Sequence, residues 1–240
     1  MAQISSTGRL GRALRSSAGA LAILGMGLAL AAPANAEKVG IAAAVNPDAF
    51  SSLSGSPQSQ LSIGIFFNER INTTTSGLVQ VLLADGSTFT VGPGSDLVID
   101  KFVYDPRKKS GEVVATFSKG VMRFVGGKIS KNEGGVTVNT PSGALAIRGG
   151  MFQGKVGAGG SLFSFLYGVE MSFTSSSGKT LTVYEAGYTL DLNGGTPNIR
   201  PTTPQDTNAL MAALTNSNTD NSSGRTGGSG NAGNSFQRFT

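Results

Sequence analysis

Residues 77–92 read GLVQVLLADGSTFTVG, and this stretch decides the fold class of the chain. Two β-prone runs, 78–83 and 88–91, flank the pair Asp85-Gly86. An Asp-Gly pair between such runs is a strong local signal for a β-hairpin, because a type I′ turn needs a positive φ at both central residues. The stretch therefore predicts a hairpin whose turn depends on Asp85 and Gly86.

Further short strands are predicted on both sides of this hairpin. They show a two-residue alternation of apolar and polar residues and are separated by glycines; the runs are 61–67, 113–118, 121–125, 136–139, 145–147, 181–184 and 187–192. Between 163 and 173 every odd residue is apolar or aromatic, which predicts a strand with Phe165 on a buried face and Leu166 on the other. This pattern predicts an all-β fold of short antiparallel strands, arranged as a sandwich or as a solenoid-like stack.

The composition agrees with a β fold and argues against most catalytic chemistry. The chain has 35 Gly among 240 residues and 14% charged residues, whereas roughly 7% Gly and a quarter charged residues are usual. It has no Cys and no His, so it offers no disulfide, thiolate nucleophile, His-containing triad or usual zinc ligand set. We therefore expect a protein that is not an enzyme and that holds no cofactor or metal.

Residues 1–36 are typical of a secretory signal peptide. Three arginines precede an apolar run at 18–32, and Ala34-Asn35-Ala36 then fits the small-x-small rule for cleavage. The apolar run is short against the roughly 20 residues that span a bilayer. We therefore expect cleavage after Ala36, a periplasmic or secreted protein, and no stable membrane span in the mature chain.

The mature chain carries little net charge. Removing the three leader arginines from the 19 basic residues leaves 16 against 14 acidic residues, a net charge of +2. A nucleic-acid-binding face needs a clustered excess of basic residues, so nucleic acid is not expected as a partner.

Composition divides the mature chain into four parts. Residues 37–76 are predicted to be an N-terminal extension of the β domain, 77–155 its central domain, and 156–195 its C-terminal strands. From residue 196 onward Asn, Ser, Thr, Gly and Pro dominate, apart from a short apolar patch at 210–214 that fits one helical turn or two. Such a segment buries too little apolar surface to offset its chain entropy, so 196–240 is predicted to be a disordered tail.

Four ordered blocks of sequence resemble the FecR domain. They are DGSTFTVGPGS (85–95), IDKFVYDP (99–106), KGVMRFVGGKISK (119–131) and TPSGALAIRGG (140–150), with NERINT (68–73) upstream. The resemblance is strongest over 77–150 and looser over 39–155, and its central part corresponds to a FecR-like domain at 77–155. The chain departs from the family at Gly150, where many members carry Thr after Ile-Arg-Gly.

The resemblance implies a signalling context. The best-known FecR-like proteins relay a signal from an outer-membrane siderophore receptor to an extracytoplasmic-function sigma factor, through a cytoplasmic arm, one membrane span and a periplasmic region. Because the apolar run of this chain resembles a cleaved signal peptide, we expect the periplasmic module without the span and the arm.

Two patterns imitate catalytic or metal-binding chemistry. Ser176 and Lys179 have the Ser-x-x-Lys spacing that resembles a penicillin-binding nucleophile, but that spacing acts on a helix and here falls in a predicted turn, so we interpret it as chance. Asp96, Asp100 and Asp105 offer oxygen ligands of the kind that calcium prefers. We interpret them instead as residues that cap and solubilise a turn, and expect no metal site.

Tyr104 and Arg148 are the predicted binding residues. Tyr104 lies in a predicted loop, and Arg148 is the charge that ends the apolar run 144–147, just before the turn residues Gly149 and Gly150. The alternative role is packing for Tyr104 and hydrogen bonding to turn carbonyls for Arg148. Gly149 and Gly150, like Asp85-Gly86, are predicted to determine the fold of their turn.

These observations favour an exported, non-enzymatic FecR-like module of the bacterial cell envelope that binds or senses a protein or a glycan. The alternative is a structural or adhesion component of an exported matrix, without a sensing role. A hydrolase is disfavoured, because no candidate nucleophile has a visible base.

Overall fold

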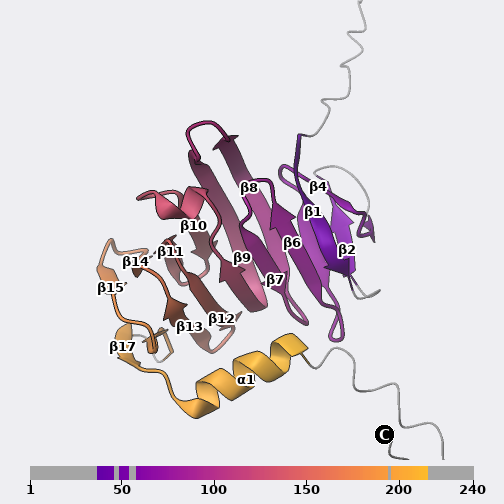
Figure 1. The fold of residues 1–240 in the computed structure, drawn as a ribbon. Coiled ribbons are helices and arrows are strands. Elements are labelled where there is room, and N and C mark those ends of the chain that lie inside the picture. The colour runs from indigo at the N-terminus through magenta and orange to yellow at the C-terminus, as the bar shows by residue number, and fades with distance from the viewer. Residues whose placement is uncertain (1–36, 46–48, 54–57, 194–195, 216–240) are drawn as a thin grey trace, which may run out of the picture. The chain divides into compact units, whose positions relative to one another are not determined.

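The computed structural model describes residues 37–45, 49–53, 58–193 and 196–215 (Figure 1). The predicted signal peptide, 1–36, and residues 216–240 of the predicted tail lie outside this part of the chain. The described residues form seventeen strands, one 3₁₀-helix and one α-helix. In this part of the chain, no helix has both the length and the apolar character needed to cross a bilayer.

The strands form two hydrogen-bonded sheets that share β9 (Ser110–Val125). Sheet A is antiparallel throughout, in the order β4 (Gly64–Phe66), β1 (Lys38–Val45), β6 (Val79–Leu83), β7 (Thr88–Val91), β9, β12 (Met151–Gly157), β13 (Gly160–Tyr167), β16 (Tyr188–Asp191) and β17 (Asn198–Pro201). Sheet B has the order β3 (Ser59–Gln60), β2 (Ala49–Ser52), β5 (Arg70–Thr73), β8 (Asp96–Asp105), β9, β10 (Val136–Thr140), β11 (Gly143–Arg148), β14 (Glu170–Ser175) and β15 (Thr180–Val183). The predicted all-β fold is confirmed, and the strand pairs are antiparallel except for β9 with β10.

Strand β9 passes from one sheet to the other at Gly120. The sequence predicts two strands, 113–118 and 121–125, where the structure has one long strand that pairs with β8 and β10 before Gly120 and with β7 and β12 after it. Gly120 has a φ of +103°, and a Cβ there would clash with Ser95. The Ser95 hydroxyl accepts a hydrogen bond from the Val121 amide at 3.0 Å, which holds the crossing point. Glycine is therefore required both for the conformation and for the close approach.

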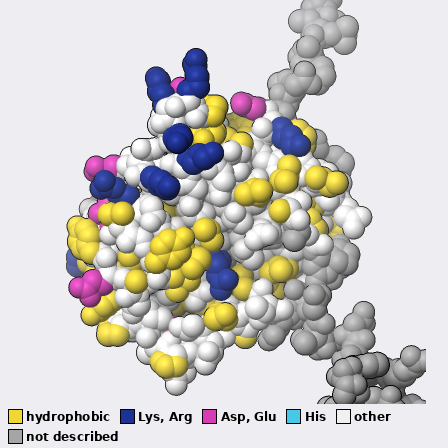
Figure 2. Space-filling view, viewed as in Figure 1, with side chains coloured by type: hydrophobic (Ala, Val, Ile, Leu, Met, Phe, Trp, Pro, Cys, Tyr) yellow, Lys and Arg dark blue, Asp and Glu magenta, His cyan; other side chains and the backbone are white. Residues whose placement is uncertain are grey.

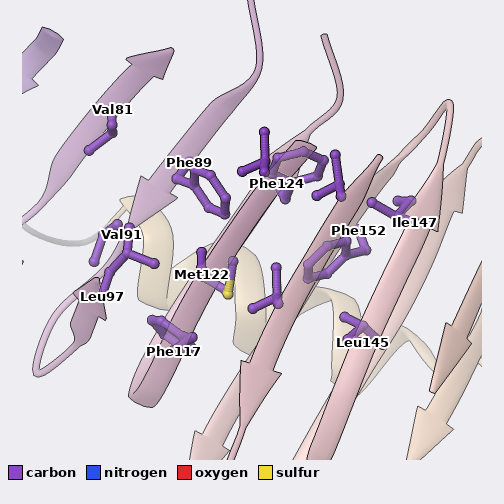
Figure 3. Close-up of a cluster of buried hydrophobic side chains, with 14 of the residues drawn as sticks. Val81, Phe89, Val91, Leu97, Phe117, Met122, Phe124, Leu145, Ile147 and Phe152 are labelled. Atoms are coloured by element: carbon purple, nitrogen blue, oxygen red, sulfur yellow. The ribbon is translucent and has the colours of Figure 1, made fainter. Parts of the chain in front are cut away.

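A single hydrophobic core lies between the two sheets and contains residues from both (Figure 3). Phe89, Phe124 and Phe152 lie opposite one another on three neighbouring strands of sheet A. Their rings pack in series, with centroid distances of 4.8 Å and 5.8 Å, and all three are fully buried. Burying one such side chain contributes roughly 1.5 to 3 kcal/mol. The core gives the described part of the chain a sandwich arrangement.

The predicted hairpin at 78–91 is confirmed, but its predicted turn type is wrong. Strands β6 and β7 pair in register, and the Gly86 amide donates to the Leu83 carbonyl at 3.0 Å while the Leu83 amide donates to the Ser87 carbonyl at 2.9 Å. Gly86 has a φ of +87°, whereas Asp85 is not among the residues with positive φ. This pattern is a three-residue loop, a type I turn followed by a glycine bulge, and not a type I′ turn.

The predicted strand at 163–173 is two strands. Gly168, with a φ of +142°, forms a turn between β13 and β14. Phe165 is fully buried as predicted and Leu166 is half-buried, but Tyr167 and Val169 are about half exposed at the turn. The apolar alternation in the sequence runs across the turn because β13 and β14 both contribute side chains to the same core.

The predicted disordered tail begins too early. Residues 198–215, which it includes, form β17 and α1 (Pro204–Thr215). Helix α1 contacts β9 and β12 on the side of sheet A that faces away from the core side chains (Figure 3). Its Leu210 and Leu214 are buried there without belonging to the main core. The two leucines give this polar segment enough apolar contact to fold against the sheet.

Arg200 fastens this C-terminal segment. Its guanidinium donates to Asp191 at 2.9 Å and to Asp206 at 2.6 Å and 3.1 Å, and the Thr202 and Thr189 hydroxyls are 2.8 Å apart. The hydrogen bonds from Arg200 hold the pKa of Asp206 well below its usual range despite partial burial. Burial raises the pKa of Asp191, but the bonds from Arg200 and Asn193 outweigh it, so that pKa is also lowered.

Candidate functional site

The hairpin turn at Asp85 is joined to the loop that follows β9. The buried Asp85 carboxylate accepts hydrogen bonds from the Ser87 amide at 2.9 Å, the Ser87 hydroxyl at 2.7 Å and the Ile129 amide at 3.1 Å. Its own carbonyl accepts from the Lys128 amide at 3.0 Å. Asp85 thus positions the 3₁₀-helix η1 (Ile129–Lys131), which lies more than 40 residues further along the chain.

The Gly149-Gly150 turn packs against the same loop. The Gly149 amide donates to the Ser130 carbonyl at 2.6 Å, and the Gly126 amide donates to the Gly150 carbonyl at 2.8 Å. Gly149 has a φ of +54°, which favours glycine. A Cβ at Gly150 would clash with the Tyr167 carbonyl, so the absence of a side chain lets the β13–β14 turn approach.

A pocket of about 260 Å³ lies where these turns meet. Three glycines and four residues with larger side chains line the pocket; they are Gly126, Ser130, Lys131, Gly149, Gly150, Tyr167 and Val169. The Ser130 hydroxyl donates to the Gly127 carbonyl at 2.9 Å and is fully buried, so it holds the loop together. The pocket therefore presents an aromatic ring, an aliphatic side chain, an ammonium group and backbone groups that no side chain covers.

Arg148 lies beside this pocket. It ends β11, faces Glu170 of β14 in the strand register, and its carbonyl accepts the Val169 amide at 3.0 Å. Within the described residues, its half-buried side chain makes no ion pair and no hydrogen bond. The predicted binding role of Arg148 stays a prediction, but its guanidinium is free to take a partner's acceptor.

Tyr104 lies elsewhere in sheet B. It belongs to strand β8, where it pairs with Gly111, and not to the loop that the sequence predicts. Its ring packs against the core, and its hydroxyl is buried without a hydrogen-bond partner in the described part of the chain. Two strands, β9 and β10, separate it from Arg148. The structure thus does not bring the two predicted residues together, and the Tyr104 environment is one of packing.

Basic side chains extend from the pocket toward the β8–β9 hairpin. Figure 2 shows Lys and Arg side chains gathered on the upper part of one face, above an apolar patch. Lys128 precedes η1 and Lys131 is its last residue, and the hairpin tip carries Arg107, Lys108 and Lys109. The Asn132 side-chain amide donates to the Lys109 carbonyl at 3.2 Å, so the hairpin tip and the loop are held together.

Among the described residues, neither the Ser-x-x-Lys spacing nor the three aspartates forms the arrangement that catalysis or metal binding would need. Ser176 and Lys179 lie at the turn between β14 and β15, as predicted, and no helix connects them. Asp105 caps its turn as interpreted, but the same role is wrong for Asp96 and Asp100, which lie within strand β8. Asp96 pairs with Arg70 at 2.7 Å, and Asp100 accepts from Thr116 at 2.7 Å. The described residues contain no group of three or more potential metal-ligating side chains.

Of the residues that line the pocket, sequence reasoning singled out Gly149 and Gly150 but not Lys131 and Tyr167, and Arg148 directly precedes this lining in the chain. Tyr167 was assigned to the buried face of one long strand. The signal that separates it from that face is Gly168, since a glycine inside a strand pattern often marks a turn or bulge.

Comparison with known proteins gives a family for the central region. Residues 69–169 match the model of the family described as FecR protein, a range that contains every residue of the pocket. No curated protein matches the chain. Two crystal structures of a proposed anti-sigma factor from Parabacteroides distasonis are similar, with 17% and 16% identity and TM-scores of 0.48 and 0.46. Each comparison covers 59% of this chain, which spans 63% and 64% of the length of those structures.

Proposed function

Because the chain is a FecR domain-containing protein, we propose that it is a non-enzymatic module of the bacterial cell envelope that binds a partner and takes part in sensing it. The observation that carries this proposal is the coincidence of the FecR match with the pocket. The match ends at residue 169, so its last element is the turn that supplies Tyr167 and Val169. The part of the chain that matches the family therefore includes every residue that lines the pocket, which supports a binding role.

The side chains at the pocket support binding over catalysis. A nucleophile needs an adjacent base within hydrogen-bond reach. The Ser130 hydroxyl is fully buried and donates to a backbone carbonyl, and Lys131 is exposed to solvent. The Ser130 hydroxyl therefore holds the loop, and the Lys131 ammonium group attracts a hydrogen-bond acceptor. Neither group is placed to attack a substrate.

Export is part of the proposal and is supported by the leader sequence. Residues 1–36 combine a basic start, a short apolar run and a small-x-small site. N-terminal sequencing of protein recovered from the periplasm or the medium should begin at Glu37. Recovery of the intact leader in a membrane fraction would contradict the proposal of a cleaved signal peptide.

Transcription in the native host tests the sensing role. Deleting the gene should change the transcript levels of a defined set of genes within one growth cycle, and the wild-type gene should restore them. A gene carrying Lys131→Gln and Tyr167→Ala should fail to restore them, whereas the control Lys179→Gln, at an exposed turn away from the pocket, should succeed. Loss of matrix or adhesion without any transcriptional change would favour the structural alternative instead.

A further inference from the structure

The pocket beside Gly149-Gly150 has the size of a site for one ring. Its volume of about 260 Å³ lies just below the range of about 300 to 1,000 Å³ that holds drug-sized ligands. Asp85, through η1, and the Gly149-Gly150 turn hold the two sides of the pocket with backbone hydrogen bonds. The site is therefore preformed, which lowers the entropy that a ligand loses on binding.

The two sides of the pocket differ in chemistry. Tyr167, which ends β13, supplies a half-exposed aromatic ring, and Val169 supplies a half-exposed aliphatic side chain. Lys131 supplies an ammonium group on the other side. Tyrosine suits a ligand with an apolar face and polar edges, because its ring is apolar and its hydroxyl forms hydrogen bonds. A sugar ring has that character, with C–H groups on its faces and hydroxyls at its edge.

Basic side chains outnumber acidic ones over the pocket and the hairpin tip taken together. Lys128, Lys131 and Arg148 make no ion pair within the described residues, and neither do Lys108 and Lys109 at the hairpin tip. Among the acidic residues nearby, Glu170 faces Arg148 in the strand register and Glu133 lies two residues after Lys131. At the hairpin tip, Asp105 accepts hydrogen bonds from the turn amides of Arg107 and Lys108. The unpaired cations attract an anionic ligand, and their extension to the hairpin tip suits a ligand longer than one ring.

From these observations, and resting on the proposed function, we propose that the pocket binds an acidic sugar unit of an anionic glycan. The sugar ring packs on Tyr167, its carboxylate lies between Lys131 and Arg148, and the following acidic units lie along Lys128 and the hairpin tip.

A titration of the full exported chain with two matched probes tests the proposal. The first probe is α-1,4-linked trigalacturonate, and the second is its methyl ester, which has the same ring without the charge. We expect trigalacturonate to shift the amide resonances of Lys131, Gly149 and Gly150 in a saturable way, with an affinity that falls as salt is added. The ester should bind at least tenfold more weakly, since a charged hydrogen bond is worth about 1.5 kcal/mol or more.

Variants separate charge from ring packing. Lys131→Gln and Tyr167→Ala should each weaken binding of trigalacturonate about tenfold, while Tyr167→Phe keeps the ring and should bind nearly as well as the wild type. Lys179→Gln and Tyr184→Ala remove matched exposed side chains outside the pocket and should leave the affinity unchanged. Unchanged thermal melting of each variant shows that the fold is intact.

Four results would overturn the proposal. Equal binding of the ester shows that charge does not matter, and equal shifts with inorganic phosphate indicate an adventitious ion only. Binding to phosphatidylglycerol vesicles that depends on Lys131, without binding of trigalacturonate, assigns the surface to lipid. A negative sugar titration together with an intact transcriptional effect of the gene rejects the sugar alone and leaves the sensing proposal standing.

Discussion

Two aspartates fasten two distant parts of this molecule in different ways. Asp85 is buried and accepts hydrogen bonds from two amides and a hydroxyl, with no cation among these donors. Asp206 is partly exposed and accepts from Arg200, which also binds Asp191. The first aspartate lies inside the FecR match and joins elements of its core, whereas the second lies outside the match and fastens a helix to the outer face of sheet A.

The difference predicts how each part fails. A buried carboxylate that is held by neutral donors leaves those donors unpaired when it is removed, and the cost falls on the whole fold. An ion pair near the surface contributes less, and its loss releases only the segment that it fastens. The β domain and the C-terminal segment should therefore behave as a stable unit and a separable attachment.

The largest effect is expected for Asp85→Ala. The change removes three hydrogen bonds and leaves the Ser87 and Ile129 amides unpaired in the interior. At about 1 to 3 kcal/mol for each unpaired group, the free energy of unfolding should fall by about 4 kcal/mol. Urea denaturation followed by circular dichroism measures this loss.

Asp85→Asn is the matched control for that experiment. Its amide keeps one oxygen acceptor but places an N–H group where Oδ2 accepts the Ile129 amide. The loss should lie between those of the wild type and the alanine variant. An alanine variant as stable as the wild type would show that water replaces the carboxylate and that Asp85 does not organise the loop.

The hairpin illustrates how far the sequence predicts this fold. The strands and the turn position at 78–91 follow from a local pattern, and the structure confirms both. The turn type could not be predicted from the local sequence. The Asp85 carboxylate accepts a hydrogen bond from the Ile129 amide, and no local pattern contains that distant partner. The need for glycine at position 150 also depends on a residue that is distant in sequence, because a Cβ there would clash with the Tyr167 carbonyl.

The C-terminal segment was missed for a different reason. Its average composition is polar, so a rule based on burial predicts disorder, yet Arg200 and two leucines suffice to hold it. A local signal was present in Thr203-Pro204-Gln205-Asp206. The Asp206 amide donates to the Thr203 hydroxyl at 3.2 Å, and the Asp206 carboxylate accepts the Thr203 amide at 2.9 Å, which is a capping box with proline at the first helical position.

Arg200→Met should detach this segment while leaving the β domain folded. The change removes both ion pairs and keeps a side chain of similar length, so we expect a local loss of about 1 to 2 kcal/mol. Hydrogen exchange should accelerate in 204–215 and stay unchanged in 79–91. Arg107→Met, at a side chain that is 93% exposed, is the control. Equal acceleration in both regions would mean that helix and sandwich unfold as one unit.

Acid should weaken the same attachment without any mutation. The folded-state pKa values of Asp191 and Asp206 lie below their usual range, so their stabilisation is fully present above pH of about 4 and is lost as the pH falls further. The methyl resonances of Leu210 and Leu214 should move toward unfolded positions below pH 4 before those of the core do. A transition in this pH range that persists unchanged in Arg200→Met would exclude the ion pairs as its cause.

The smallest effect is expected at Gly86, in the turn that Asp85 anchors. Gly86 has a φ of +87°, but a Cβ built there meets no atom within 4 Å, so alanine introduces backbone strain without a clash. Strain of this kind costs about 1 kcal/mol, well below the loss expected for Asp85→Ala. Asn tolerates positive φ better than Ala, so Gly86→Asn should cost less than Gly86→Ala in the same urea denaturation. If Gly86→Ala were as damaging as Asp85→Ala, the conformation of the glycine, and not the buried carboxylate, would organise this end of the sandwich.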